Sequence, residues 1–155
     1  MMTIKEAHID YKNGVMGTMH EVGYFEGKID SLEATNFISL YGIAKDTLRR
    51  SLKIYCENAG VCFQWLRAYY IWWWYKWYNN IFYKIREADS TGATLFPFTS
   101  GKNKFNFIHI NDLLIQISKT VIQSKICGVI NCCSYELVAL AEQVEKIYIW
   151  RQIKH

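Results

Sequence analysis

Residues 39–66, SLYGIAKDTLRRSLKIYCENAGVCFQWL, decide the fold class of this chain. Apolar residues recur every three or four positions in the first part, which predicts an amphipathic helix over Ser39–Asn58. Ser39 is a suitable N-cap, and Gly60 stands where a helix is expected to end. Val61–Leu66 is short and rich in aromatic and branched residues, so we predict a buried strand there. The apolar side of the helix is expected to consist of Leu40, Ala44, Leu48, Leu52 and Tyr55.

The remainder of the chain continues this alternation of helices and strands. The periodicity predicts helices over Asn79–Ala88, Asn111–Ser124 and Glu136–Ile149, and a strand over Cys127–Cys132. Asn111 is suited to cap the second of these helices, whose apolar side is expected to contain Leu114, Ile117, Val121 and Ile122. The glycine-containing stretches Gly14–Asp30 and Asp89–Asn106 are expected to be loops. Strands that alternate with helices favour parallel pairing, so the fold class is predicted to be α/β.

Length and composition exclude several classes of protein. The chain has 155 residues, of which 51% are hydrophobic and one is proline, so it is neither disordered nor collagen-like. Its net charge of +4 is spread along the sequence, and without a clustered basic face we expect no nucleic-acid partner. The most apolar stretch, Ala68–Tyr75, is far shorter than the roughly 20 residues of a membrane helix. The start at Met1 does not resemble a secretory signal, so a cytoplasmic location is expected.

The five cysteines do not have the spacing of a metal site. Neither a C-x₂-C pair nor a paired His-x₃-His motif is present, so no metal is expected. Because their number is odd and a cytoplasmic chain is kept reduced, we predict free thiols rather than disulfides. Three of them are expected to be small buried apolar groups: Cys127, Cys132 and Cys133.

Tyr41 and Lys45 are the first candidates for chemistry. Four positions apart on a helix, they lie on one face and one turn apart. An ammonium group beside a phenol favours the phenolate and lowers a tyrosine pKa toward the range of a general acid/base. The spacing alone is not specific, because the chain also contains Tyr24 and Lys28 at the same separation. The surrounding sequence must therefore decide between a site and coincidence.

That surrounding sequence has a recognisable order. Five stretches follow one another along nearly the whole chain, from about Asn13 to Ile147: Gly17–Tyr24, Thr35–Lys45, Leu66–Arg67, Phe107–Leu113 and Gly128–Asn131. In order and spacing they resemble the C-terminal half of an extended short-chain dehydrogenase/reductase, the NAD-dependent epimerase/dehydratase family. The resemblance implies a partial, doubly wound, Rossmann-like parallel sheet.

The resemblance also implies roles for individual residues. Tyr41 would be the acid/base that exchanges a proton with a sugar hydroxyl or carbonyl, and Lys45 would lower its pKa and bind the nicotinamide ribose. Thr18 would hydrogen-bond the reacting oxygen, unless the register slips by one to Met19, which has no hydroxyl. Tyr69 and Tyr70 would be neighbours of the cofactor, which is NAD or NADP. Nucleotide sugars are the expected substrates, held in part by the loops after Trp72 and around Lys102–Phe107.

The sequence departs from the family pattern in three places. The strand, glycine-rich turn and helix that bind a dinucleotide cannot be formed by the few residues before Gly14. Ala68 replaces the usual proline, and Trp72–Trp74 replaces a glycine that lets the backbone approach a ligand. We therefore predict a single truncated domain over residues 1–155, which needs a homo-oligomeric partner or a complementing N-terminal half because of its open sheet edge.

Other residues have simpler interpretations. His20 beside Glu21 could form a proton relay, but a loop histidine bonded to backbone is the preferred interpretation. His109 is predicted to be structural at a strand end, and Asp112 to lie in the first turn of the following helix. The aromatic run Tyr69–Tyr78 could stack on bases or sugars. A buried or partner-facing cluster is the preferred interpretation.

Three hypotheses for function follow, and the sequence leaves them open. The chain is one half of a split enzyme, an inactive remnant of one, or a remnant that serves as an interaction module through Trp72–Trp77. Retention of Tyr41, Lys45 and Thr18 favours the first, whereas tryptophan in place of glycine favours the other two. Whether the chain is an enzyme by itself, which nucleotide sugar it takes, and whether NAD or NADP is preferred are all undetermined by the sequence.

Overall fold

The structure is a computed structural model that describes residues 12–25, 29–30, 35–73, 81–93, 96–97, 99–123 and 125–153. The chain divides into two compact units, which we describe separately. The first contains Met1–Tyr69 and Asn111–Cys132, and the second contains Tyr70–Ile110 and Cys133–His155. The predicted single domain over residues 1–155 stays a prediction.

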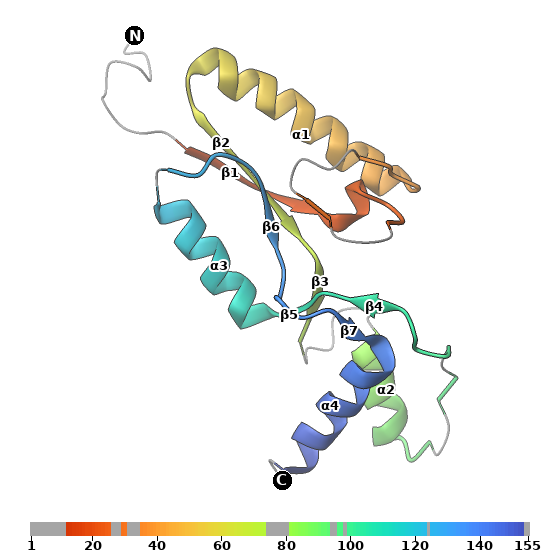
Figure 1. The fold of residues 1–155 in the computed structure, drawn as a ribbon. Helices are drawn as coiled ribbons and strands as arrows, with labels where there is room; N and C mark the ends of the chain where they lie inside the picture. Colours follow the sequence, from red (N-terminus) through yellow and green to blue (C-terminus); the bar gives the residue numbers. More distant parts are fainter. Residues whose placement is uncertain are drawn as a thin grey trace. The chain divides into compact units, whose positions relative to one another are not determined.

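A three-stranded parallel sheet is the centre of the first unit (Figure 1). Its order is β1-β2-β6, formed by Lys12–Thr18, Cys62–Ala68 and Gly128–Cys132. Leu66 in the middle strand is in register with Met16 on one side and Ile130 on the other. The predicted strands near residues 62 and 128 are confirmed, and so is the parallel α/β class.

Helix α1, Leu40–Ala59, ends where the sequence predicts. The Ser39 hydroxyl accepts a hydrogen bond from the Gly42 amide at 3.1 Å, which satisfies one of the unpaired donors of the first turn. Gly60 has a φ of 64°, and its amide donates to the carbonyls of Cys56 and Glu57. This left-handed position after the last helical residue is the usual reason for glycine at a helix end.

Helices cover both faces of the sheet. Successive side chains of a strand point to opposite faces, and the contacts follow that rule. On one face Asn13 contacts Cys56 of α1, and Phe63 and Trp65 pack against the same cysteine. On the other face the Gln64 amide donates to the Thr120 carbonyl of α3, Ile110–Ile122, at 3.0 Å. Figure 1 shows α1 and α3 on either side of the three strands, which confirms the doubly wound arrangement.

The apolar sides of these two helices are not where we predicted a core. In α1, Leu40 is 85% exposed and Tyr55 64% exposed, while the side facing the sheet carries Gly42, Asp46 and Cys56. In α3, Leu113 is buried, whereas Leu114, Val121 and Ile122 are exposed. Of the predicted α1 stripe, Leu52 packs against the buried cluster of Cys56, Phe63 and Trp65. Periodicity therefore identified the buried side of these helices only in part.

The second unit is built around aromatic side chains. Strand β3, Tyr70–Trp72, pairs in parallel with β5, Phe107–His109, and β4, Lys104–Phe105, pairs antiparallel with β7, Val138–Ala139. The helices are α2, Ile81–Ser90, and α4, Leu140–Ile153. The buried core consists of Phe82, Phe107, Val138 and Ile147.

Several predicted boundaries were wrong for identifiable reasons. The expected loop from Gly14 includes most of strand β1, because backbone pairing with β2 outweighs the weak strand preference of its glycines. The last helix begins at Leu140 rather than Glu136, because Val138 and Ala139 pair with β4. Asn111 lies inside α3 and does not cap it. The predicted helix start at Asn79 lies outside the described residues.

The prediction of reduced cysteines was also wrong for one pair. Cys62 and Cys127 form a disulfide. Cys62 begins β2 and Cys127 directly precedes the neighbouring strand β6, so the register of the two parallel strands brings them together. Cys127 is exposed, Cys133 is half-buried, and burial raises the pKa of the Cys133 thiol. Only Cys132 matches the expected buried group.

Candidate functional site

Tyr41 and Lys45 lie together in the first turns of α1. The Lys45 ammonium is 6.0 Å from the centre of the Tyr41 ring. It donates a hydrogen bond to the Met16 carbonyl of β1 at 3.0 Å, which holds it beside the edge of the sheet. Tyr41 is 54% exposed. The pair is thus positioned by the backbone on one side and open to solvent on the other.

Thr18 and His20 border this pair. Thr18 is the last residue of β1 and the N-cap of the 3₁₀ turn η2, Met19–Glu21, where its hydroxyl oxygen accepts from the His20 amide at 3.3 Å. Because that oxygen acts as acceptor, its O–H can still donate to a ligand. The His20 ring stands edge-on to the Tyr41 ring, with centroids 5.8 Å apart. His20 is therefore a neighbour of Tyr41 that sequence spacing did not reveal.

A glycine permits this approach of helix and turn. A Cβ atom on Gly42 would lie 2.6 Å from the His20 carbonyl oxygen and 3.0 Å from the Phe37 side chain. Any larger residue after Tyr41 would push α1 away from η2. The close packing of α1 on η2 thus explains why glycine follows Tyr41. The site itself lies at the carboxyl end of the parallel strand β1, which is the end where open α/β sheets bind ligands.

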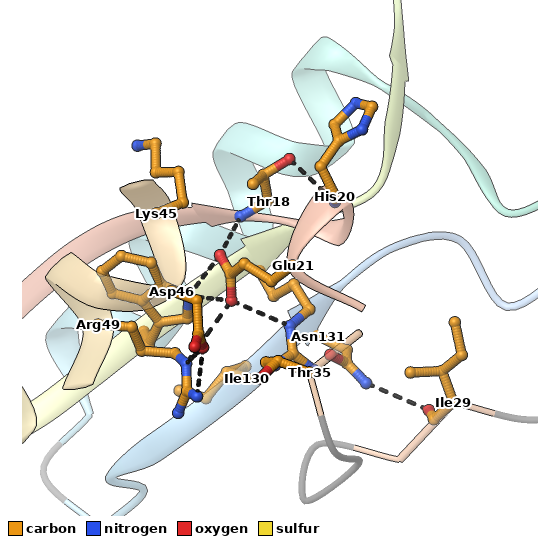
Figure 2. Close-up of polar contacts among 12 residues, drawn as sticks. Thr18, His20, Glu21, Ile29, Thr35, Lys45, Asp46, Arg49, Ile130 and Asn131 are labelled. Carbon is orange, nitrogen blue, oxygen red and sulfur yellow. Dashed lines mark hydrogen bonds and ion pairs between the residues drawn. The ribbon is translucent and has the colours of Figure 1, made fainter. Parts of the chain in front are cut away.

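Beneath the site lies a buried carboxylate, Glu21, with four partners (Figure 2). It accepts from the Thr18 amide at 2.8 Å and from the Trp65 indole N–H at 2.9 Å. The guanidinium groups of Arg49 and Arg67 approach it at 3.7 and 3.6 Å. We call Glu21, Trp65, Arg67, Asp46 and Arg49 the Glu21 cluster.

Asp46 extends this cluster along α1. Its carboxylate accepts from Arg49 at 2.6 Å and from Arg50 at 2.7 Å. Burial acts to raise the pKa of Asp46, but the hydrogen bonds and positive charges of these arginines outweigh it and hold the pKa below its usual value. Arg50 in turn donates to the Thr35 hydroxyl.

The Glu21 cluster ties three elements of the first unit together. Glu21 belongs to the turn η2 that follows β1, Arg49 to α1 and Trp65 to β2. Figure 2 shows Lys45 extending away from the dashed contacts of this cluster. The alternative of a proton relay between His20 and Glu21, which the sequence did not favour, is not supported, because the Glu21 carboxylate is buried and bonded to the partners above.

The remaining predicted residues have structural surroundings. Tyr69 is buried, and its amide donates to the Cys132 carbonyl at 3.1 Å. Tyr70 belongs to the second unit, where its ring packs 4.3 Å from Phe105 and burial raises its pKa. Their contact with a cofactor stays a prediction. His109 ends β5 against Trp72, as predicted for a structural histidine.

Three further observations concern what the described residues contain. Asp112 lies in the first turn of α3, which confirms its predicted place. Within the described ranges no helix is both long and apolar enough to cross a membrane. Among those same residues, no three histidine, cysteine or acidic side chains gather in a way that could hold a metal ion. Residues 74–77 of the tryptophan run lie outside the described residues.

Comparison with known proteins gives one sequence relative and many structural neighbours. No family model matches the chain. The chain is 39% identical over 150 residues to dTDP-6-deoxy-L-talose 4-dehydrogenase (NAD(+)) from Aggregatibacter actinomycetemcomitans, a match that covers 96% of this chain and 55% of the relative. Solved structures extend the likeness. UDP-N-acetylglucosamine 4-epimerase from Methanobrevibacter ruminantium M1 superposes with a TM-score of 0.78 at 18% identity, over 88% of this chain and 46% of that one.

Two more neighbours were solved with NAD. UDP-glucuronic acid 4-epimerase from Bacillus cereus has a TM-score of 0.76 at 20% identity, covering 86% of this chain and 45% of that one. dTDP-glucose 4,6-dehydratase from Bacillus anthracis has a TM-score of 0.76 at 16% identity, and the match covers 86% of this chain and 44% of the dehydratase.

The chain has the fold of the C-terminal portion of the NAD-dependent epimerases and dehydratases. The predicted resemblance to this family is confirmed. The chain spans about half the length of the epimerases, dehydratases and dehydrogenase that it matches.

Proposed function

We propose that this chain carries the proton-transfer half of an NAD-dependent enzyme that oxidises or epimerises a nucleotide sugar. The observation that carries the proposal is the placement of Tyr41 and Lys45 at the carboxyl end of β1, beside Thr18. These three residue types are the ones that the family resemblance assigns to the reacting centre. The Glu21 cluster holds the turn that bears Thr18 against the helix that bears the pair.

The proposed reaction assigns one task to each side chain. Tyr41 takes the proton from the sugar hydroxyl as the carbon is oxidised, and returns it when the carbonyl is reduced. Lys45, whose ammonium lies 6.0 Å from the centre of the Tyr41 ring, binds the nicotinamide ribose. Thr18 donates its hydroxyl hydrogen to the reacting sugar oxygen, which orients it toward Tyr41. The hydride acceptor would be supplied by NAD, held in part by Lys45.

The residues fit one end of a nicotinamide dinucleotide. Lys45 has three N–H donors and uses one on Met16, so the others are available to a ribose hydroxyl. Tyr41 is half exposed and accessible to a nicotinamide ring. A glycine-rich strand–turn–helix for the pyrophosphate does not occur in the part of the chain that the structure describes. We therefore propose that an N-terminal half must complete the cofactor site.

The sequence relative narrows the proposed substrate. At 39% identity it is a much closer guide than structural neighbours of 15–20% identity, and it is named for oxidation of dTDP-6-deoxy-L-talose. We propose a dTDP-6-deoxyhexose, oxidised at C4, as the substrate to test first. UDP-sugar epimerisation, named in several structural neighbours, is the second reaction to test.

The test uses a fusion protein in which the N-terminal portion of that relative precedes this complete chain. Incubation with NAD⁺ and dTDP-6-deoxy-L-talose should produce reduced nicotinamide, followed by its absorbance. Tyr41→Phe should lower turnover about a hundredfold or more, because general acid/base catalysis is lost. Tyr24→Phe is the matched control, since Tyr24 is 72% exposed and belongs to the other Tyr-x₃-Lys pair. Equal turnover in wild type and Tyr41→Phe would refute the assignment.

A non-catalytic interaction module is the alternative, and the outward apolar side chains of α1 favour it. It predicts a folded fusion protein without turnover, in which Tyr41→Phe changes nothing. Stable self-association of the chain alone, abolished by polar substitutions such as Leu40→Asp, would support this alternative. The same two preparations therefore distinguish the two functions.

A further inference from the structure

His20 places a base beside the proposed acid/base, and the reaction proposed above does not use it. The imidazole stands edge-on to the Tyr41 ring, with the ring centroids 5.8 Å apart and an angle of 76° between the planes. The neighbouring carboxylate of Glu21 is buried and bonded elsewhere, so it does not engage the imidazole. The His20 side chain is exposed, and water therefore reaches it.

The backbone holds His20 in this place. Its amide donates to the Thr18 hydroxyl oxygen at 3.3 Å, and the Val22 amide closes the turn on the Met19 carbonyl at 3.0 Å. A Cβ atom on Gly42 would lie 2.6 Å from the His20 carbonyl oxygen, so the helix packs directly on the turn. These contacts use backbone atoms of His20. Its exposed ring can therefore be replaced while the turn is kept.

Oxidation of a sugar alcohol leaves a proton that must be removed, and on this point the inference rests on the proposed function. The reaction breaks the C–H and O–H bonds of the alcohol. It yields a ketone, NADH and one proton from the alcohol and NAD⁺. The hydride leaves with NADH, while the proton stays on the Tyr41 oxygen. Tyr41 must lose that proton before it can act again. An epimerase differs, because the proton returns to the sugar within the same turnover.

The side chains that border Tyr41 differ in their ability to accept this proton. Lys45, as an ammonium, has three donors and no acceptor. The Thr18 side chain is buried, and its oxygen already accepts from a backbone amide. The imidazole of His20 is the kind of side chain that takes up and releases protons near neutral pH. Water can also accept the proton, but it is a much weaker base than imidazole.

We propose that His20 is the proton exit of the site. After each oxidation the proton passes from the Tyr41 oxygen, through one water molecule, to a ring nitrogen of His20. The imidazolium then releases it to bulk solvent and returns to the neutral base. One O–H bond breaks and one N–H bond forms in the first transfer, and the second transfer reverses the change on His20. A single bridging water is within the reach of general acid/base catalysis.

Stopped-flow kinetics of the fusion protein test the proposal. The protein is mixed with NAD⁺ and dTDP-6-deoxy-L-talose in weak buffer, and absorbance reports NADH while phenol red reports released protons. In His20→Ala the first turnover should form NADH at the wild-type rate. Later turnovers and proton release should be at least about tenfold slower, because water replaces the base only in part. A first turnover that is slowed equally would make His20 a positioning residue for the Tyr41 ring, and would overturn the proposal.

Two comparisons separate the base from the ring. His20→Phe keeps an aromatic edge beside Tyr41 but has no basic nitrogen, so its later turnovers should be as slow as those of His20→Ala. Added imidazole should restore His20→Ala, because the vacated position is open to solvent. Pyrrole has the same ring shape without a basic nitrogen, and it should not restore the variant. Wild-type turnover in His20→Phe, or equal rescue by pyrrole, would contradict a role in proton transfer.

Nuclear magnetic resonance of the chain alone tests the geometry without cofactor or turnover. Nuclear Overhauser contacts are expected between the ring protons of His20 and Tyr41. Tyr55, about four turns further along α1, should show none with His20. Absence of the His20–Tyr41 contact would overturn the proposal.

The kinetic outcomes keep this proposal apart from the proposed function. An active fusion protein in which His20→Ala is as fast as wild type would refute the proton exit and leave the proposed function standing. A folded fusion protein without any turnover would refute the proposed function, and the proton exit with it.

Discussion

Two groups of polar residues lie next to each other at helix α1 and differ in burial and in pairing. The Glu21 cluster is buried, and each of its carboxylates has at least two charged or hydrogen-bonding partners. Tyr41 and Lys45, one turn away, are accessible, and the phenol has an aromatic neighbour, His20, and a nearby ammonium. Buried charges are expensive unless fully paired. An incompletely paired polar group is tolerated where solvent, or a ligand, can reach it.

This difference indicates that the Glu21 cluster positions the surrounding elements, whereas Tyr41 and Lys45 are available for binding and catalysis. The Glu21 cluster connects the end of β1 with α1 and β2, so it determines where the neighbouring groups stand. The exposed pair contributes little to that framework and keeps its hydrogen-bonding capacity for a ligand. Substitutions in the Glu21 cluster should therefore lower stability, whereas substitutions in the pair should affect ligand binding and turnover alone.

The largest effect is expected from Glu21→Gln. The substitution leaves Arg67, which is 1% exposed, without its buried counter-ion. Loss of one partner of a buried ion pair costs about 3–5 kcal/mol of unfolding free energy. Urea denaturation measures it, with Glu57→Gln as control because Glu57 forms an exposed pair with Lys53. A loss below about 1 kcal/mol would show that Glu21 is not the centre of the framework.

Gly17→Ala comes next. A Cβ atom at Gly17 would overlap the Trp65 indole nitrogen that donates to Glu21. Overpacking of this kind costs about 1–3 kcal/mol. Gly14→Ala is the matched control in the same strand, because its Cβ would make ordinary contacts of 3.5 and 3.8 Å. Equal thermal stability of the two variants would contradict the close packing of Trp65.

The decrease of the unfolding free energy at acidic pH should depend on Asp46. Its pKa is lowered in the folded state, so its ionised form stabilises the fold above the ordinary value of 3.8. That contribution is lost as the pH falls below 3.8 and through the lowered folded pKa. In wild type the urea concentration at the midpoint of unfolding should therefore decrease as the pH falls through this range. This decrease should be smaller in Asp46→Asn and unchanged in Asp112→Asn. An unchanged slope in Asp46→Asn would contradict the lowered pKa.

The smallest effect on stability is expected from Tyr41→Phe. Tyr41 is exposed, and removal of an exposed hydroxyl changes the unfolding free energy by less than about 0.5 kcal/mol. Differential scanning calorimetry should give nearly the same melting temperature as wild type. A large decrease would place Tyr41 in the framework and remove the contrast between the two groups.

The parts that were predictable from sequence depend on local chemistry. Ser39 and Gly60 determine the ends of α1 through hydrogen bonds within a few residues, and the four-residue spacing brings Lys45 to Tyr41. Other features depend on contacts between distant residues. Trp65 donates to Glu21 from 44 positions away, and the pairing of β2 with β6 brings Cys127 to Cys62. Periodicity cannot report such contacts.

Exposure was the least predictable property. An apolar stripe indicates that a helix face is covered, but not by what, and Val121 and Leu40 are exposed in the described structure. Periodicity identifies a continuous apolar stripe on a helix, but exposure depends on which other elements pack against that helix, and this information is not local to the helix sequence.

A titration with NADH tests most directly whether the exposed pair is a ligand site. Energy transfer from the six tryptophans to the nicotinamide is followed in the fusion protein and in its Lys45→Met variant. Lys53→Met, on the exposed surface of the same helix, is the control. We predict saturable binding that Lys45→Met weakens about tenfold and Lys53→Met leaves unchanged. Binding that is absent, or indifferent to Lys45, would contradict the account.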